Sequence, residues 1–277
     1  FIRSAVGNGL HSCGLSPHAP LSLPTSWALS APQLTTYLTD VQRLRLEWAG
    51  DIEILAGLEV DYVPGLDWWE QIGPQYRELD YIIGSVHLLD CFPDGSPFFI
   101  DRSPAHFEQG LAQIFEGDVQ AAATRYYELV RWMVMLESPD IVGHLDKFKL
   151  HNAAGKFFSE NEDWYRAEIL KTLDVIAKSG SLIEVNTRGL YSGQSLDLYP
   201  SQWILERVHD LRIPIVLTSD AHRPEELTAG FSVAARILKN IGFQTLSVLH
   251  EHSWIQVPFD EAGLQMPWEN QLGNKSA

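Results

Sequence analysis

The chain has 277 residues, 45% hydrophobic and 11% aromatic, a composition that supports a packed globular core and excludes a disordered chain. Its formal net charge of −16 disfavours binding to nucleic acid, because a phosphate backbone attracts a basic surface. No apolar run approaches the ~20 residues of a membrane span, so no membrane partner is expected. Only Cys13 and Cys91 are present, which disfavours a disulfide framework and predicts a reducing cytoplasm.

The first residues have the pattern of a helix already under way. Ile2, Val6 and Leu10 are spaced by four, as on one helical face, and a strand over 11–16 would follow. Because the chain opens inside a helix on a residue other than Met, we expect an earlier strand to be missing from this sequence. A short native helix left by processing is the alternative.

The remainder of the chain alternates helical and strand patterns, which is typical of parallel βα units. Helices are predicted over 33–48, 68–79, 104–115, 118–136, 163–179, 200–211 and 225–241. Strands are predicted over 52–58, 81–86, 141–143, 182–185, 215–218 and 252–257. Residues 91–103 are rich in Pro, Gly and Asp and indicate a long loop over the site. Without a visible repeat or linker, a single domain over 1–277 is expected, with a frayed tail after about Pro267.

Apolar runs along the chain repeatedly end on residue types that bind metals. These residues are His18, Glu59, His87, His144, Asp220 and His222. In parallel α/β proteins the carboxyl ends of the strands meet at one edge, so these side chains would converge there. Imidazole combined with carboxylate suits Zn, Mn or Fe better than Ca or Mg alone. The sequence therefore predicts a multinuclear metal-dependent hydrolase.

Several of these residues also have a plainer interpretation, which for His87 and His144 is a satisfied histidine at the rim. Asp220 could cap the next helix beside a solvated His222, although residues two apart on an extended segment point the same way and can both be ligands. Glu59 could form a salt bridge at the rim, although its carboxylate could also bridge two metals. Asp61 is either an acceptor for a ligating histidine or a loop residue, and the sequence does not decide between them.

Several segments of the chain, in order, resemble one family. They are 14–21 (GLSPHAPL), 57–65 (GLEVDYVPG), 80–87 (DYIIGSVH), 142–152 (VGHLDKFKLHN), 184–191 (EVNTRGLY) and 217–227 (LTSDAHRPEEL). From about residue 9 to residue 242 the chain resembles the histidinol-phosphate phosphatase branch of the polymerase and histidinol phosphatase (PHP) superfamily. The resemblance implies a distorted (β/α)7 TIM-like barrel, with its first strand missing here. It also implies a divalent metal cluster of up to three ions (Zn, Mn or Fe) at the mouth.

The resemblance also assigns the ligands to individual metals. It implies Glu59 bridging two metals, His87 and His144 on one of that pair, Asp220 on the other, and His18 and His222 on a third. The family's His-x-His motif does not precede Ile2. The chain is therefore expected to hold only part of the cluster and to be poorly active.

The expected reaction is hydrolysis of a small phosphate ester, and the resemblance implies L-histidinol phosphate, on the route to histidine. Arg188 is the predicted phosphate clamp, with a rim salt bridge as the alternative. Asn186 is expected to orient the substrate or the Arg188 turn, and Arg223 is either a second clamp or a helix-start salt bridge. Asp220 or a water would protonate the leaving group. The acidic and aromatic residues of 91–103 would suit a substrate that carries an imidazole and an ammonium.

Two other functions remain open at this point. One is another PHP phosphoesterase, acting on a nucleotide or a sugar phosphate, and the other is a metal-binding scaffold that has lost its activity. The scarcity of Lys and Arg argues against a nucleic-acid substrate. The sequence leaves the native metal and the oligomeric state undecided.

Overall fold

The computed structural model describes residues 1–23, 25–195 and 197–266, and the tail predicted after Pro267 lies outside them. Six parallel strands form a curled sheet in the order β1-β2-β3-β6-β7-β8. They are β1 (Ser12–Leu15), β2 (Glu53–Asp61), β3 (Tyr81–Ser85), β6 (Ile141–Val142), β7 (Leu182–Asn186) and β8 (Ile215–Thr218). The predicted parallel βα architecture is confirmed. Strand β2 runs beyond the predicted 52–58, so Glu59 lies inside a strand rather than after it.

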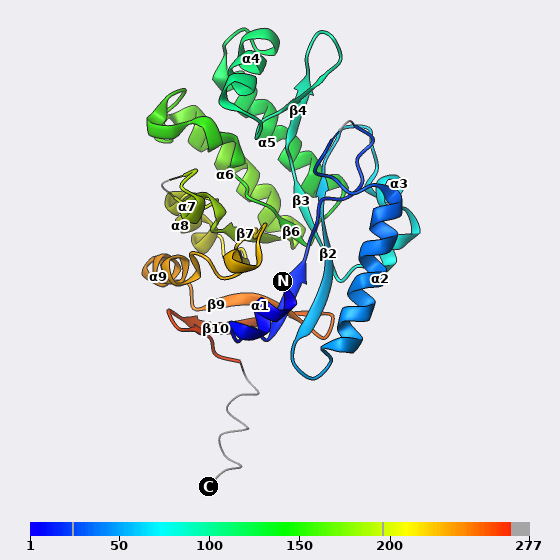
Figure 1. Ribbon diagram of the computed structural model, residues 1–277. Helices are drawn as coiled ribbons and strands as arrows, with labels where there is room; N and C mark the ends of the chain where they lie inside the picture. Colours follow the sequence, from blue (N-terminus) through cyan, green and yellow to red (C-terminus); the bar gives the residue numbers. More distant parts are fainter. Residues whose placement is uncertain (24, 196, 267–277) are drawn as a thin grey trace.

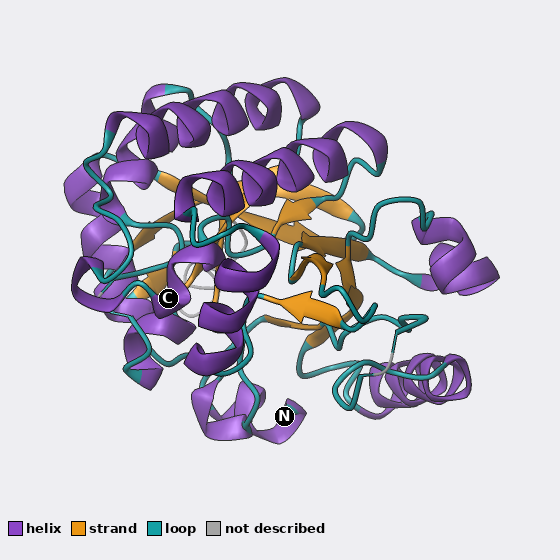
Figure 2. Cartoon of the chain, turned by 90° about the horizontal axis from the view of Figure 1, so that it is seen from above, coloured by secondary structure: helices purple, strands orange, loops and turns teal. Residues whose placement is uncertain are grey.

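Helices surround the curled sheet (Figure 2). The longer ones are α2 (Ala31–Glu47), α4 (Pro104–Ile114), α5 (Val119–Leu136), α6 (Asp163–Ser179), α8 (Gln202–Asp210) and α9 (Phe231–Ile241). The short ones are α1 (Ile2–Gly7), α3 (Trp68–Ile72) and α7 (Arg188–Ser192), with 3-10 turns at η1 (Gly73–Glu78), η2 (Lys147–His151), η3 (Ala153–Gly155) and η4 (Pro224–Glu226). Among the described helices, none has both the length and the apolar character needed to cross a membrane.

Three predicted elements differ from the structure for local reasons. The helix predicted over 68–79 ends at Ile72, because Gly73 takes a φ of 71° and Pro74 lacks an amide proton. The helix predicted over 225–241 is interrupted at Gly230, whose φ is 78°. The helix predicted over 200–211 begins only at Gln202. In the first two cases a glycine with positive φ, which the helical pattern does not encode, breaks the helix.

The loop predicted over 91–103 is wrong in its first half. Strands β4 (Leu88–Cys91) and β5 (Pro97–Phe99) pair there as an antiparallel hairpin, which projects beyond the carboxyl ends of the parallel strands (Figure 1). The turn contains Asp94 and Gly95, a pair that favours hairpins, and Gly95 has a positive φ of 84°. The second half of the predicted loop connects this hairpin to α4.

A second antiparallel unit follows α9, and only part of it was predicted. Strand β10 (Ser253–Asp260) covers the strand predicted over 252–257, whereas β9 (Thr245–His250) and β11 (Gly263–Leu264) were missed. Leu249 of β9 and Trp254 of β10 pack with Leu55 and Ile83 in a small apolar cluster. The unit therefore covers the amino-terminal end of the concave face.

The concave face of the sheet changes from apolar to polar along the strands. Side chains alternate between the two faces of a strand, and every second residue of β2 lies on this face. Leu55 belongs to the small apolar cluster at the amino end, Gly57 contacts Tyr81, and Glu59 and Asp61 reach the carboxyl end. The intervening side chains pack against the helices in the large core. One alternating pattern thus supplies both the core and the polar end.

The ring of Tyr81 fills the middle of the concave face. A Cβ at Gly57 would lie 2.3 Å from Cζ of Tyr81, and one at Gly14 would lie 2.4 Å from its hydroxyl oxygen. Gly57 and Tyr81 are register partners on adjacent strands. The close approach of the ring therefore requires glycine at both neighbouring positions.

We predict that Gly57→Ala lowers the free energy of unfolding by about 1–3 kcal/mol, because the added methyl overpacks against Tyr81. Denaturant unfolding followed by circular dichroism measures the change. Gly50→Ala is the matched control, since a Cβ at Gly50 meets nothing within 4 Å. Equal effects of the two substitutions would contradict this account of the packing.

Candidate metal centre

Three side chains converge on one point at the carboxyl end of the sheet, one from β2 and two from the loops that follow the adjacent strands β3 and β6. His144 Nε2 lies 3.1 Å from Glu59 Oε1 and 3.2 Å from His87 Nε2. His87 Nε2 is 3.7 Å from the same Glu59 oxygen. Two imidazole nitrogens and a carboxylate oxygen that face one another at these distances are arranged as ligands around a single cation.

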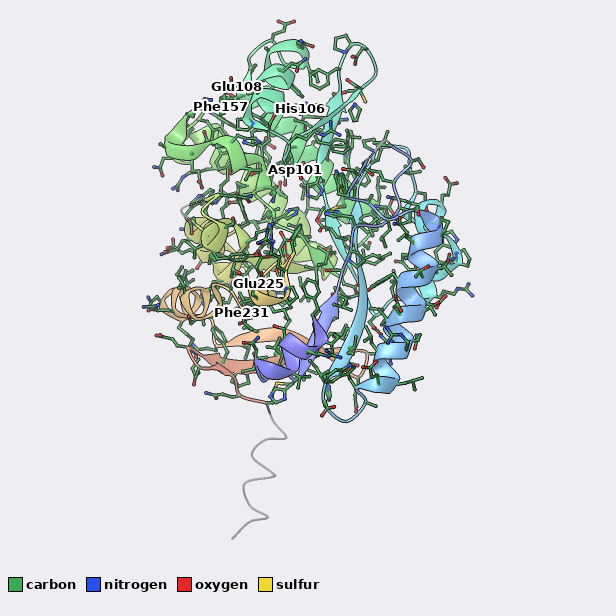
Figure 3. All side chains as sticks on the ribbon, viewed as in Figure 1. Asp101, His106, Glu108, Phe157, Glu225 and Phe231 are labelled. Carbon is green, nitrogen blue, oxygen red and sulfur yellow. The ribbon has the colours of Figure 1, made fainter. Side chains whose placement is uncertain are left out.

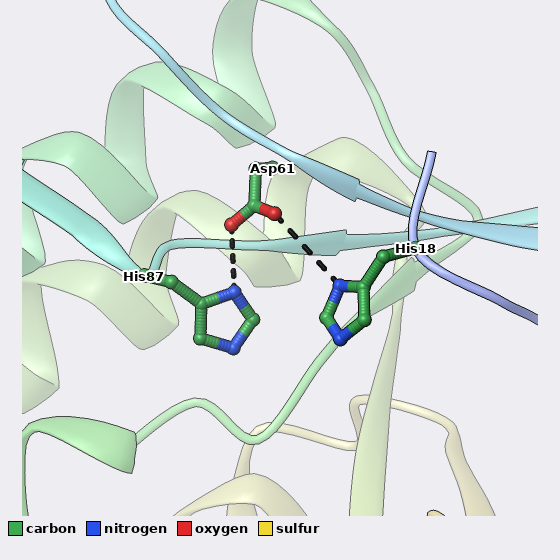
Figure 4. A group of neighbouring side chains, drawn as sticks. All are labelled: His18, Asp61 and His87. Atoms are coloured by element: carbon green, nitrogen blue, oxygen red, sulfur yellow. Dashed lines mark hydrogen bonds and ion pairs between the residues drawn. The ribbon is translucent and has the colours of Figure 1, made fainter. Parts of the chain in front are cut away.

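A second group of possible ligands adjoins the first (Figure 4). Asp61 Oδ1 accepts a hydrogen bond from His87 Nδ1 at 2.6 Å, and Asp61 Oδ2 lies 3.8 Å from His18 Nδ1. His18 is held beside Glu59 by a parallel β-bridge, and its Nε2 is 3.7 Å from Glu59 Oε2. Asp61 is buried and fixes the ring of His87, so the structure favours the acceptor role over the loop residue.

The donor set fits divalent cations. The Nδ1 atoms of His18 and His144 are buried, and neither has a hydrogen-bond partner in the described part of the chain. Glu59 offers two carboxylate oxygens, one toward each group. Nitrogen and carboxylate oxygen together favour Zn and other transition metals over Ca. The described residues therefore support binding of divalent metal.

Electrostatic interactions at this site keep the Glu59 carboxylate charged and attract the surrounding histidine imidazoles to it. Burial alone would raise the pKa of Glu59, but the charge of His18 and the hydrogen bond from His144 hold that pKa well below its usual range. Burial lowers the pKa of His87, whereas the charges of Asp61 and then Asp101 raise it to about 10. In the absence of metal, His87 is therefore protonated at neutral pH.

Glu184 supports this end of the sheet and was missed by the sequence analysis. It accepts hydrogen bonds from the backbone N–H of His144 at 2.6 Å and from the Thr218 hydroxyl at 2.6 Å. Burial raises the pKa of its carboxyl group, and so does the charge of Asp220. The available signal was a carboxylate in the middle of an apolar strand, where an unpaired charge would be costly. Glu184 positions the loop that carries His144.

Asp220, Asn186 and Arg188 form a neighbouring polar group. Asn186 Nδ2 donates to Asp220 Oδ2 at 3.3 Å, and Arg188 Nη1 donates to the carbonyl oxygen of Asp220 at 2.9 Å. Asp220 has a positive φ of 49°, a conformation that Asp tolerates better than most residues. Arg188 Nη1 also lies 3.1 Å from the Tyr191 hydroxyl and 3.5 Å from Glu226. Arg188 thus helps to fix the backbone of Asp220.

The structure does not gather every predicted ligand into the two metal-binding groups. In the described chain, these groups contain His18, Glu59, Asp61, His87 and His144 but neither Asp220 nor His222. The His222 side chain is 58% exposed, with its Nδ1 atom 3.0 Å from the Asp220 carbonyl oxygen. Arg223 is exposed, and its backbone N–H donates to Glu226. The predicted roles of these residues, and of Asn186 and Arg188, stay predictions.

We predict that Asp61→Asn weakens zinc binding by about 10–100-fold, because it removes the acceptor that orients His87. Competition with a chromophoric chelator measures the affinity. Asp40→Asn is the control, since Asp40 is exposed on α2 and pairs with Arg43. Wild-type affinity in the Asp61 variant would contradict the positioning role.

We also predict that zinc binding to the metal-free protein releases a proton from His87. Metal binding requires neutral imidazole, and the pKa of about 10 keeps this ring protonated until the pH is high. The apparent affinity should therefore rise by about tenfold per pH unit between pH 7 and pH 9 for this proton alone. Calorimetry in buffers of different ionisation enthalpy counts the protons. Binding without proton release at pH 7 would show that the ring is already neutral.

The comparison with protein families agrees with the geometry. The PHP domain family matches residues 1–188. A probable histidinol-phosphatase of Deinococcus radiodurans is 29% identical over 252 residues, which cover 90% of this chain and 89% of that protein. The histidinol-phosphatase of Bacillus subtilis is 26% identical over 242 residues, covering 80% of this chain and 86% of that protein.

Solved structures show the same fold. A putative histidinol phosphatase of Listeria monocytogenes superposes with a TM-score of 0.74 at 22% identity, covering 84% of this chain and 91% of that one. A histidinol phosphate phosphatase of Lactococcus lactis, complexed with zinc, L-histidinol and phosphate, superposes with a TM-score of 0.65 at 18% identity, covering 96% and 91%. The distorted, TIM-like curled sheet expected from the resemblance is confirmed. With the match over residues 1–188, the chain belongs to the PHP domain family.

Proposed function

We propose that this protein is a metal-dependent phosphomonoesterase that hydrolyses L-histidinol phosphate to L-histidinol and phosphate. The observation that carries the proposal is the convergence of Glu59, His87 and His144 on one point, with His18 and Asp61 beside them. Relatives at 29% and 26% identity carry the histidinol-phosphatase name. The structurally similar Lactococcus lactis protein holds zinc, L-histidinol and phosphate.

The proposed cofactor is a cluster of up to three divalent ions, zinc in the first instance, with manganese or iron as alternatives. Glu59, His87 and His144 would hold one ion, with His18 and Asp61 near a neighbouring position. When bound, such ions supply Lewis-acid activation of the phosphate ester and of water. Glu59 contributes one carboxylate oxygen toward each group, as expected for the predicted bridging ligand. Asp220 and His222 complete the proposed ligand set.

The chain's own residues would bind and orient the phosphoryl group. All described hydrogen bonds of the Arg188 guanidinium use Nη1, so Nε and Nη2 are not engaged by them. We assign these two nitrogens to the phosphoryl oxygens, in the fork geometry that arginine presents to phosphate. Asn186 holds Asp220 and the Arg188 turn, since it also accepts from the Arg188 backbone N–H at 2.9 Å. Asp220 or a water is the proposed proton donor to the leaving alkoxide, and Arg223 is a second proposed phosphate contact.

The surroundings of the site agree with a small, soluble substrate. The net charge of −16 opposes a polyanionic partner, whereas a few cations at the site can still attract one phosphate group. Both cysteines are free, which supports the proposed cytoplasmic location. We further propose that residues 1–277 form one domain.

We predict that the natural full-length protein releases phosphate from L-histidinol phosphate when zinc, manganese or iron(II) is added. Glu59→Gln should lower kcat/KM by at least about a hundredfold, because charge stabilisation by the metals is worth several kcal/mol. Glu47→Gln is the control, since Glu47 lies exposed on α2 and pairs with Arg43. A colorimetric phosphate assay gives the rates.

The same assay can overturn the assignment. If the metal-loaded wild-type protein releases no phosphate from this ester, the proposed substrate is wrong. If it releases phosphate and Glu59→Gln is fully active, the cluster is not the catalytic centre. Metal content measured on the same samples separates a lost metal from a lost reaction.

A further inference from the structure

Two segments outside the metal ligands meet over His87. The ring of Trp27, in the loop after β1, lies 6.2 Å from the ring of His87 and 4.6 Å from that of His18. Trp27 also contacts Phe99 of the β4–β5 hairpin, with ring centroids 5.7 Å apart. Trp27 remains 38% exposed, whereas Phe99 is buried. An accessible aromatic surface therefore borders the metal centre on this side.

Asp101 adds a carboxylate to the same border. The backbone N–H of Ile100, the preceding residue, donates to the carbonyl oxygen of His87 at 2.9 Å, which fixes the turn beside the metal centre. Asp101 is exposed, and Figure 3 shows it between the hairpin region and the carboxyl ends of the strands. Its negative charge contributes to the raised pKa of His87, second to that of Asp61 among the charges.

The neighbouring cation, Arg102, does not pair with the carboxylate of Asp101. The guanidinium of Arg102 lies over the ring of Phe99, 5.0 Å from its centroid. In the part of the chain that the structure describes, no ion pair within 4.0 Å involves Asp101. An acidic group that borders a metal centre without a partner is suited to a cationic group on a bound molecule.

We propose that Asp101 and Trp27 form the subsite for the alcohol half of the substrate, with Asp101 binding its ammonium group and Trp27 packing against its flat ring. This inference rests on the proposed function and adds the groups that select the leaving alcohol. Arg188 follows β7, and the hairpin follows β3, two strands away in the sheet order. We place the phosphoryl group at Arg188 and the alcohol half on the hairpin side, at Asp101 and Trp27. The class of substrate is a phosphomonoester of an amino alcohol that carries an aromatic ring.

The hairpin offers a matched acidic control. The carboxylate of Asp94, at the hairpin turn, accepts hydrogen bonds from the backbone N–H of Ser96 at 2.9 Å and from its hydroxyl at 2.6 Å. Asn can accept both bonds, so Asp94→Asn removes one charge from the hairpin that precedes Asp101 without removing its turn. The two substitutions therefore change the net charge equally and differ only in where the charge lies.

The test measures binding of L-histidinol to the zinc-loaded, full-length protein by calorimetry. We expect Asp101→Asn to weaken binding by about tenfold or more, because a charge-assisted hydrogen bond is lost. Inorganic phosphate should bind to this variant within about twofold of the wild-type affinity. Asp94→Asn should bind L-histidinol as the wild type does. Trp27→Ala should also weaken L-histidinol binding, and Trp27→Phe should restore most of it.

Kinetics provide the second readout. The ratio of kcat/KM for L-histidinol phosphate to that for phenyl phosphate should fall by about tenfold or more in Asp101→Asn. An unchanged ratio, or wild-type affinity for L-histidinol, overturns the subsite. If the wild-type protein still hydrolyses L-histidinol phosphate in that case, the proposed function stands without it.

The experiments also recognise the reverse case, in which the subsite exists but the proposed substrate is wrong. The wild-type protein could ignore L-histidinol phosphate yet prefer O-phosphoethanolamine to glycerol 3-phosphate, and Asp101→Asn could remove that preference. The cation subsite would then stand and the proposed function would fall. A wild-type protein that neither binds L-histidinol nor prefers aminated esters overturns both.

Discussion

The carboxylate of Glu59 is the group through which the carboxyl ends of several strands of this sheet interact. Its two oxygens face histidines that follow β1, β3 and β6, at distances from 3.1 to 3.7 Å. Such a carboxylate in a largely buried place needs compensating positive charge, whether protons on the imidazoles or divalent ions. The position of Glu59 within β2 depends on register: a slip of one residue would turn both Glu59 and Asp61 toward the helices.

The polar layer is stabilised by residues that do not themselves belong to the two metal-binding groups. Glu184 accepts from the His144 backbone and from Thr218, linking the loops after β6 and β8. Arg188 and Asn186 hold Asp220 in its left-handed conformation through its carbonyl oxygen and its side chain. The apolar cluster, which includes Tyr81, fills the amino-terminal part of the concave face, and the ligands lie at its carboxyl end. The fold thus places Glu59 and Asp61 on a strand and the histidines just past strand ends, and surrounds them with oriented partners.

Much of this arrangement could be predicted from the sequence, because it follows from the period of the strands. Parallel strands whose apolar runs end at or near Glu59, His87 and His144 bring these three residues to one edge of the sheet. The role of Asp61 could not be decided from the sequence. Its two alternatives differ only in whether a ligating histidine lies beside its carboxylate. The hairpin at 88–99 was missed because its strands are short. Glu184 was missed because its partners are backbone and hydroxyl groups from distant segments.

The proposed chemistry depends on a divalent cation held by Glu59, His87 and His144. Anomalous diffraction at the zinc edge, from crystals of the full-length protein grown with zinc, tests this most directly. We expect a peak at about 2.0–2.2 Å from a Glu59 oxygen and from the Nε2 atoms of His87 and His144. Anomalous peaks confined to other residues, with the Glu59 carboxylate still paired directly to His144, would contradict it.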